Sequence, residues 1–179
     1  MLKGKFSSNP TNILDFGINW TLIGHSERRH TVAEESDELI AEKTKIALAN
    51  GVKVILCIGE LLEDREAGKT MDVCKAQLQA VINVLEEKDW ENIVIAYEPV
   101  WAIGTGKVAT PDQAEETHAQ IRAFMASSVS PAVAENVRIV YGGSVNAKNC
   151  DNLISKEDID GFLVGGASLK PEFVQIINC

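Results

Sequence analysis

The chain has 179 residues, of which 45% are hydrophobic and 24% are charged, and its formal net charge is −9. This composition is typical of a soluble globular protein, and the negative charge argues against a nucleic acid or an anionic membrane as a partner. No apolar run is long enough to span a bilayer, and the residues after Met1 lack the apolar core of a signal peptide. We therefore expect a cytoplasmic protein.

The elements predicted along the chain alternate between short apolar strands and helices. Asn9 and Pro10 open a first helix that ends near Phe16, with Gly17 as its stop. The remaining predictions follow in chain order: a strand over 18–24, a helix over 36–50, a strand over 52–58, a helix over 70–87, a strand over 93–96, a helix over 111–127, a strand over 137–141, a helix over 147–154, a strand over 161–164 and a helix over 171–177.

This β-α alternation predicts parallel strands joined by right-handed crossovers. The repeat length favours a (β/α)₈ barrel over an open doubly wound sheet, although only about five of the eight strand–helix units are recognisable. We therefore predict an α/β protein whose residues 1–179 form a single, incomplete TIM-barrel domain.

The cysteines carry no metal-binding or disulfide pattern. They lie far apart, with no Cys-x-x-Cys pair and no cysteine–histidine cluster at ligand spacing, at Cys57, Cys74, Cys150 and Cys179. We expect no metal site and a reducing compartment, and we interpret Cys57 as a small core residue.

The most informative stretch begins at the strand over 93–96 and ends at Lys107. Glu98 follows the strand at once, Pro99 ends its ladder, and the glycines of Gly104-Thr105-Gly106 allow a hinge. A lone glutamate in this place is usually an ordinary surface residue. The whole string from Tyr97 to Lys107, however, resembles the sixth-strand signature of triosephosphate isomerase at every position.

Three more strand ends carry polar or glycine-rich motifs. They are Gly24-His25-Ser26-Glu27-Arg28-Arg29, Tyr141-Gly142-Gly143-Ser144 and Val164-Gly165-Gly166-Ala167-Ser168-Leu169. A single histidine is more often a core or surface residue than a catalyst, and a glycine pair is usually a turn. After apolar strands, glycine pairs also suit a phosphate, because bare backbone N–H groups can approach its oxygens. The three motifs resemble the fourth-, seventh- and eighth-strand motifs of the same family.

The resemblance implies an isomerase of glycolysis and gluconeogenesis that interconverts dihydroxyacetone phosphate and D-glyceraldehyde 3-phosphate through an enediolate. It implies Glu98 as the catalytic base, His25 as the neutral electrophile and Glu27 as a group that fixes the polar network beside His25. It also implies a small phosphorylated three-carbon substrate, a homodimer and no metal or organic cofactor.

The same resemblance implies a lid, a latch and a phosphate site. Trp101 is the latch, with Tyr97 and Glu60 as its partners, and the Tyr141 hydroxyl holds the closed lid; simple packing of Trp101 is the alternative. The phosphate site consists of the backbone N–H groups of Gly104, Ser144, Gly165 and Gly166. The rest of the lid is Pro99, Val100, Ala102, Ile103, Thr105, Gly106 and Lys107.

The resemblance extends from about Gly17 to the end of the chain. Nothing matches the first two strands of the family, most of its third strand, or its Asn-x-Lys motif with the catalytic lysine, and Lys3 and Lys5 are not assigned that role. We therefore expect the chain alone to be unstable and weakly active or inactive, with a homodimer doubtful. Such a chain is either a fragment or misassembled gene model of an ordinary isomerase, or a natural truncated form that acts as a non-catalytic binding or complementation module. A different phosphate-binding barrel enzyme is disfavoured by the joint presence of the His25 and Glu98 motifs.

Overall fold

The computed structural model describes residues 9–103 and 108–179. Within them, four strands form one parallel sheet in the order β1-β2-β3-β4. Their bounds are β1 Trp20–Ile23, β2 Lys53–Ile58, β3 Ile93–Tyr97 and β4 Arg138–Tyr141. The expected α/β class and the parallel strand direction are both confirmed.

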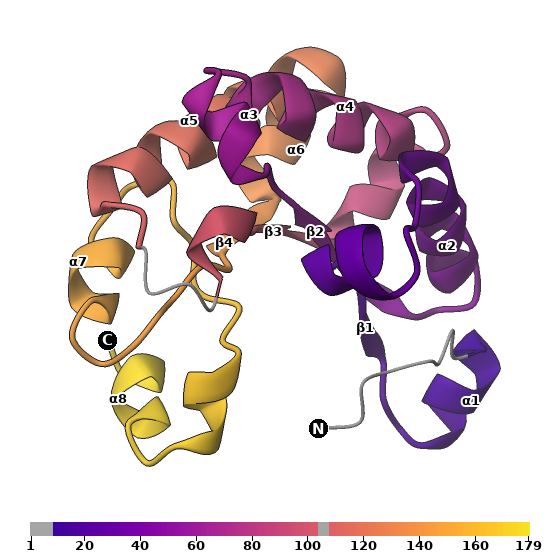
Figure 1. Cartoon of the computed structure of the whole chain (residues 1–179). Coiled ribbons are helices and arrows are strands. Elements are labelled where there is room, and N and C mark those ends of the chain that lie inside the picture. Colours follow the sequence, from indigo (N-terminus) through magenta and orange to yellow (C-terminus); the bar gives the residue numbers. More distant parts are fainter. Residues whose placement is uncertain (1–8, 104–107) are drawn as a thin grey trace.

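The helices lie along the outer side of an arc whose inner side is the sheet (Figure 1). α1 and α8 occupy its two tips. The α-helices are α1 Pro10–Asp15, α2 Asp37–Ala49, α3 Leu62–Glu66, α4 Thr70–Ile82, α5 Pro111–Ser128, α6 Pro131–Asn136, α7 Cys150–Ile154 and α8 Phe173–Ile177. Shorter helical turns cover Arg28–Val32, Glu87–Asn92, Val100–Ala102 and Gly166–Leu169. None of the described helices is both long and apolar enough to cross a membrane.

Capping chemistry explains where the best-predicted helices begin. The Asn9 side chain accepts a hydrogen bond from the Thr11 amide, and Pro10 then opens α1. Thr110 and Gln113 form a reciprocal capping box at the start of α5, immediately before Pro111. These local signals are readable from sequence, and the structure confirms both helices.

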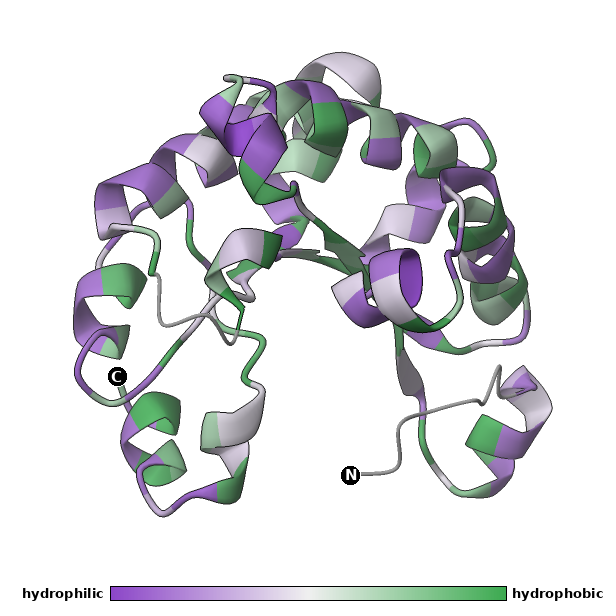
Figure 2. Cartoon of the chain, in the orientation of Figure 1, coloured by the Kyte–Doolittle hydropathy of each residue, from purple (hydrophilic) through white to green (hydrophobic). Residues whose placement is uncertain are grey.

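The core lies between the sheet and the outer helices. The central strand β3 is buried at every position, and apolar residues follow the sheet while hydrophilic ones cover the outward helix faces (Figure 2). On α2 the buried stripe runs through Ile40, Thr44 and Ala47, so the apolar residues Leu39 and Ile46 fall on its flanks and are exposed.

Two predicted elements differ from the structure. The helix expected over 70–87 ends at Ile82, because Glu86 and Asp89 form a capping box that starts a separate 3₁₀ turn. The strand expected over 161–164 pairs with β4 through a single bridge, Phe162 with Tyr141. Its backbone still follows the edge of β4, since the Tyr141 amide donates to Gly161 at 2.9 Å and the Leu163 amide donates to Tyr141 at 3.0 Å.

Candidate active site

The carboxyl ends of the parallel strands bring the predicted site residues to one rim. His25 follows β1, Glu98 follows β3 and Gly142 follows β4, and the register pairs Tyr97 with Tyr141. A cavity of about 450 Å³ opens at this rim. Six predicted site residues line it: His25, Glu98, Ile103, Ser144, Gly165 and Gly166.

Glu98 is almost completely buried, with 3% of its surface exposed. Its Oε1 lies 3.3 Å from Nε2 of His25, and its Oε2 accepts a 3.3 Å hydrogen bond from the Ser26 amide. Burial raises the pKa of Glu98, while the nearby His25 and the hydrogen bonds from Ser26 and Cys57 act in the opposite direction. A carboxylate whose basicity is raised by exclusion of water is suited to removing a proton from carbon.

The hydrogen bond to Nδ1 of His25 fixes the proton on its other ring nitrogen. The Glu27 amide donates to Nδ1 of His25 at 3.3 Å, and a backbone N–H can only donate. Nδ1 therefore carries the lone pair, and in the neutral ring the proton is on Nε2, which faces Glu98. His25 can thus present an N–H donor to a ligand in the cavity.

Glu27 itself is placed differently from the expectation. Its side chain is exposed, and the contact with His25 is made by its backbone amide instead. The side chain that does buttress this loop, Arg29, was not predicted. Arg29 is buried and donates to the carbonyls of Gly24 at 2.8 Å and of Cys57 at 3.2 Å, which ties the end of β1 to β2.

Cys57 is also closer to the chemistry than its apolar context suggests. It is a core residue, as predicted, but its thiol also lies close enough to the Glu98 carboxylate to lower the pKa of that group. Burial raises the pKa of this thiol well above its ordinary value. The thiol is therefore a neutral donor to Glu98 rather than a competing anion.

Two glycines leave room for the Glu98 segment. A Cβ at Gly142 would lie 2.7 Å from Cγ of Glu98, and a Cβ at Gly59 would lie 1.8 Å from the Glu98 carbonyl oxygen. Both positions therefore require the absence of a side chain.

The predicted latch residues meet at Glu60, which is fully buried. The Trp101 indole donates to Glu60 at 2.9 Å, and the Tyr97 hydroxyl lies 3.1 Å from both carboxylate oxygens. Arg65 lies 3.7 Å from the same carboxylate and stacks over the Trp101 ring at 5.9 Å. The turn Val100–Ala102, which follows Pro99, is therefore anchored to the end of β2.

Ser144 and Tyr141 both lie beside the lid segment. The Ser144 hydroxyl donates to the Ala102 carbonyl at 2.7 Å. The Tyr141 hydroxyl is buried and makes no hydrogen bond with good geometry among the described residues, although the Ala109 backbone lies close enough to act on it. Burial raises the pKa of Tyr141 to about 12, so the hydroxyl stays protonated. The predicted lid residues Gly104, Thr105, Gly106 and Lys107 lie outside the described residues.

The remaining phosphate-site residues present unused backbone donors. Across residues 9–103 and 108–179, no hydrogen bond is donated by the amides of Ser144, Gly165 or Gly166. All three residues line the same cavity as His25 and Glu98. Free amides at this place can bind an anion.

Fold and site together define a parallel α/β protein with a buried carboxylate, a neighbouring histidine and glycine-rich segments around one cavity at the carboxyl ends of its strands. The family model for triosephosphate isomerase matches residues 4–179, so the match begins earlier than the expected Gly17. The chain belongs to the triosephosphate isomerase family.

Curated relatives agree with this assignment. The chain is 62% identical over 170 residues to triosephosphate isomerase of Coprinopsis cinerea, covering 95% of this chain and 67% of the relative. It is 64% identical over 168 residues to that of Candida albicans, covering 94% and 66%. It is 59% identical over 167 residues to the chloroplastic enzyme of Secale cereale, covering 93% and 55%. The chain thus spans about two thirds of the length of the two fungal relatives.

Proposed function

We propose that the protein carrying these residues interconverts dihydroxyacetone phosphate and D-glyceraldehyde 3-phosphate. The observation that carries the proposal is the 3.3 Å approach of His25 Nε2 to Glu98 Oε1 at the mouth of the cavity. A carboxylate base and an N–H donor that face one cavity are the two groups that proton transfer next to a carbonyl requires. No observation favours the non-catalytic binding or complementation module.

In the proposed reaction, Glu98 takes the proton from the carbon next to the carbonyl. The electron pair of the broken C–H bond forms the enediolate, whose oxygen accepts a hydrogen bond from Nε2–H of His25. Glu98 then returns the proton to the neighbouring carbon while the hydroxyl proton passes to the former carbonyl oxygen, so the aldose and the ketose exchange without any net change in atoms. In the structure His25 and Glu98 contact each other, so the substrate must separate them in order to bind.

The phosphate group is proposed to bind the amides of Ser144, Gly165 and Gly166, none of which donates a hydrogen bond to another residue that the structure describes. Gly104, as part of the lid, is proposed to add a fourth amide. With Trp101 and Tyr97 held by Glu60, the segment beyond Ala102 is proposed to close over the substrate and exclude water. Tyr141 is the proposed hydroxyl partner of the closed lid.

The assembly and the location are also proposals. A homodimer and the cytoplasm follow from the family resemblance, and the free cysteines Cys57, Cys74, Cys150 and Cys179 suit a reducing compartment. Light scattering of the purified protein tests the dimer.

A coupled assay with dihydroxyacetone phosphate as substrate tests the activity. His25→Gln should lower kcat by about 10²- to 10³-fold, because the Gln amide cannot reproduce the placement of Nε2–H. Glu42→Gln is the matched control, since Glu42 is exposed on α2 and does not line the cavity. If His25→Gln and the control have the same activity as the unmodified protein, the assignment of the electrophile is wrong.

A further inference from the structure

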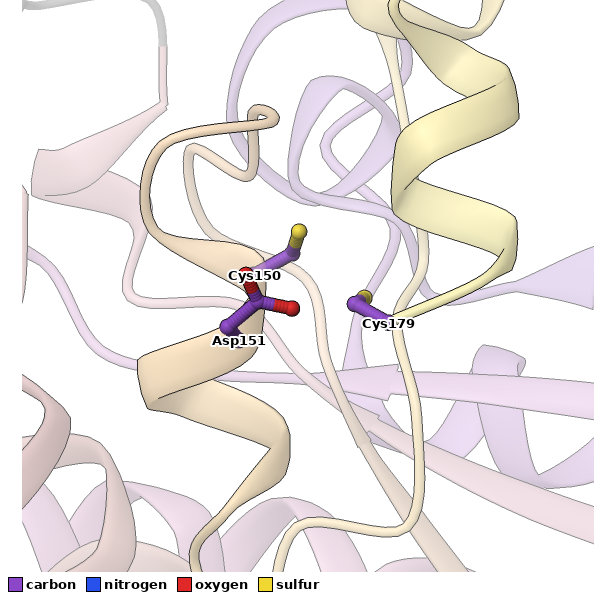
Figure 3. Close-up of side chains that lie close together, drawn as sticks. All are labelled: Cys150, Asp151 and Cys179. Carbon is purple, nitrogen blue, oxygen red and sulfur yellow. The ribbon is translucent and has the colours of Figure 1, made fainter.

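Three metal-ligand side chains from distant parts of the sequence meet near the end of α8. Cys150 and Asp151 open α7, and Cys179 lies on the segment that follows α8 (Figure 3). Their two Sγ atoms and one carboxylate oxygen all lie within 4.8 Å of one another. We propose that these residues bind a thiophilic divalent cation, with Zn²⁺ as the best fit.

The set of donor atoms supports this choice of ion. Two thiolates and a carboxylate are established Zn²⁺ ligands, whereas Mg²⁺ and Ca²⁺ require oxygen ligands alone. Two thiolates on a tetrahedral Zn²⁺ lie about 3.8 Å apart, as follows from a Zn–S distance of about 2.3 Å. Side-chain rotations that move the donor atoms by about 1 Å therefore suffice to bring all three into the coordination sphere.

The surroundings leave these donors available. The Cys179 thiol donates to the Ile176 carbonyl at 3.0 Å and so carries its proton when no metal is bound. The Asp151 carboxylate forms no ion pair among the residues that the structure describes. Cys150 is buried, but Cys179 is partly exposed and Asp151 is exposed, so an ion can enter from solvent. Binding would release the two thiol protons, and water would complete the fourth position.

This site is separate from the cavity at the carboxyl ends of the strands, and it was not predictable from cysteine spacing. Cys150 and Cys179 enclose a stretch that includes Phe162, Gly165 and Gly166. A bound ion would join the start of α7 to the segment after α8, and would thereby stabilise that stretch against unfolding. The inference does not depend on the proposed isomerase activity.

The test is calorimetric titration of purified protein with Zn²⁺ alone, in the presence of a reductant that is not itself a thiol. We expect one ion per chain and a rise in Tm of several degrees that EDTA reverses. Cys179→Ser and Asp151→Asn should each weaken binding by about 10-fold or more, since even partners outside the coordination sphere change metal affinity by about that factor. Both residues are accessible, so their replacement leaves the fold intact.

Two matched variants control for the loss of a thiol or a surface charge elsewhere. Cys74→Ala and Asp72→Asn should bind Zn²⁺ as the unmodified protein does. With Co²⁺ as the probe, the thiolate-to-metal absorption should vanish in Cys179→Ser. Reduced protein that takes up no Zn²⁺, or binding that Cys179→Ser leaves unchanged, would overturn the proposal. Reduced protein that binds no ion but forms a Cys150–Cys179 disulfide on oxidation would overturn it as well.

Discussion

The Ser26 amide donates a hydrogen bond to Oε2 of Glu98 across 72 positions of sequence, at a distance of 3.3 Å. This bond joins the loop after β1 to the end of β3, and it holds one oxygen of the carboxylate beside that loop. Together with His25 on the other oxygen, it gives Glu98 a defined position. Catalysis by proton transfer depends on such positioning.

Replacing Glu98 with Gln should abolish most of the activity and yet stabilise the fold at neutral pH. Removing the general base should lower kcat by about 10²- to 10⁴-fold. Burial raises the pKa of Glu98, so its ionisation opposes folding as pH rises through the folded-state pKa. Thermal unfolding should therefore give Glu98→Gln the higher Tm at pH 7.5 and a smaller advantage near pH 4. A lower Tm at pH 7.5 would contradict this account.

The pH dependence of kcat/KM should show an acid limb set by Glu98. The base must be ionised, so activity is lost as pH falls through its pKa, and burial places that loss above the ordinary 4.5 of a glutamate. The Cys57 thiol lowers this pKa by hydrogen bonding, so Cys57→Ala should move the limb to higher pH. Cys57→Ser keeps a donor and should leave the limb nearly in place. Equal shifts in the two variants would show that the thiol hydrogen bond plays no part.

Replacing Trp101 with Phe should weaken the link between the lid segment and β2. The indole N–H bonded to buried Glu60 is lost, although Tyr97 and Arg65 still contact that carboxylate. The cost should be about 1 kcal/mol, or about 2–4 °C in Tm. Tyr97→Phe is a matched comparison, because it removes a different donor to the same carboxylate. An unchanged Tm in both variants would mean that these donors add nothing to stability.

Replacing Gly142 with Ala should lower activity much more than stability. The new Cβ would lie 2.7 Å from Cγ of Glu98, and that side chain must move to make room. A shift of about 1 Å can cost about 100-fold in rate. For stability, Gly165→Ala is the comparison, because no atom of the described residues lies within 4 Å of a Cβ there. Full activity in Gly142→Ala, with kcat and Tm both unchanged, would show that the segment has more room than the structure indicates.

Sequence predicted the parts of this protein that depend on local chemistry or on strand ends. A Thr followed by a Pro, as at Thr110 and Pro111, is a typical helix start, and the carboxyl ends of parallel strands share a rim, which is why His25 and Glu98 meet as expected. Contacts between side chains that lie far apart in the sequence could not be predicted from it. The apolar sequence around Cys57 indicates a buried residue, but it does not indicate that the thiol lies beside Glu98. The approach of Cys150 to Cys179 depends on how α7 and α8 pack.

The Gly59 backbone passes so close to the Glu98 carbonyl that even one added carbon atom would overlap it. Selection for folding and selection for activity should therefore both exclude a replacement at residue 59. Any added side chain first pushes apart the two central strands, and with them the two groups on which turnover depends. A library of random replacements at residue 59, selected only for folded protein, should therefore return glycine even when activity is not assayed.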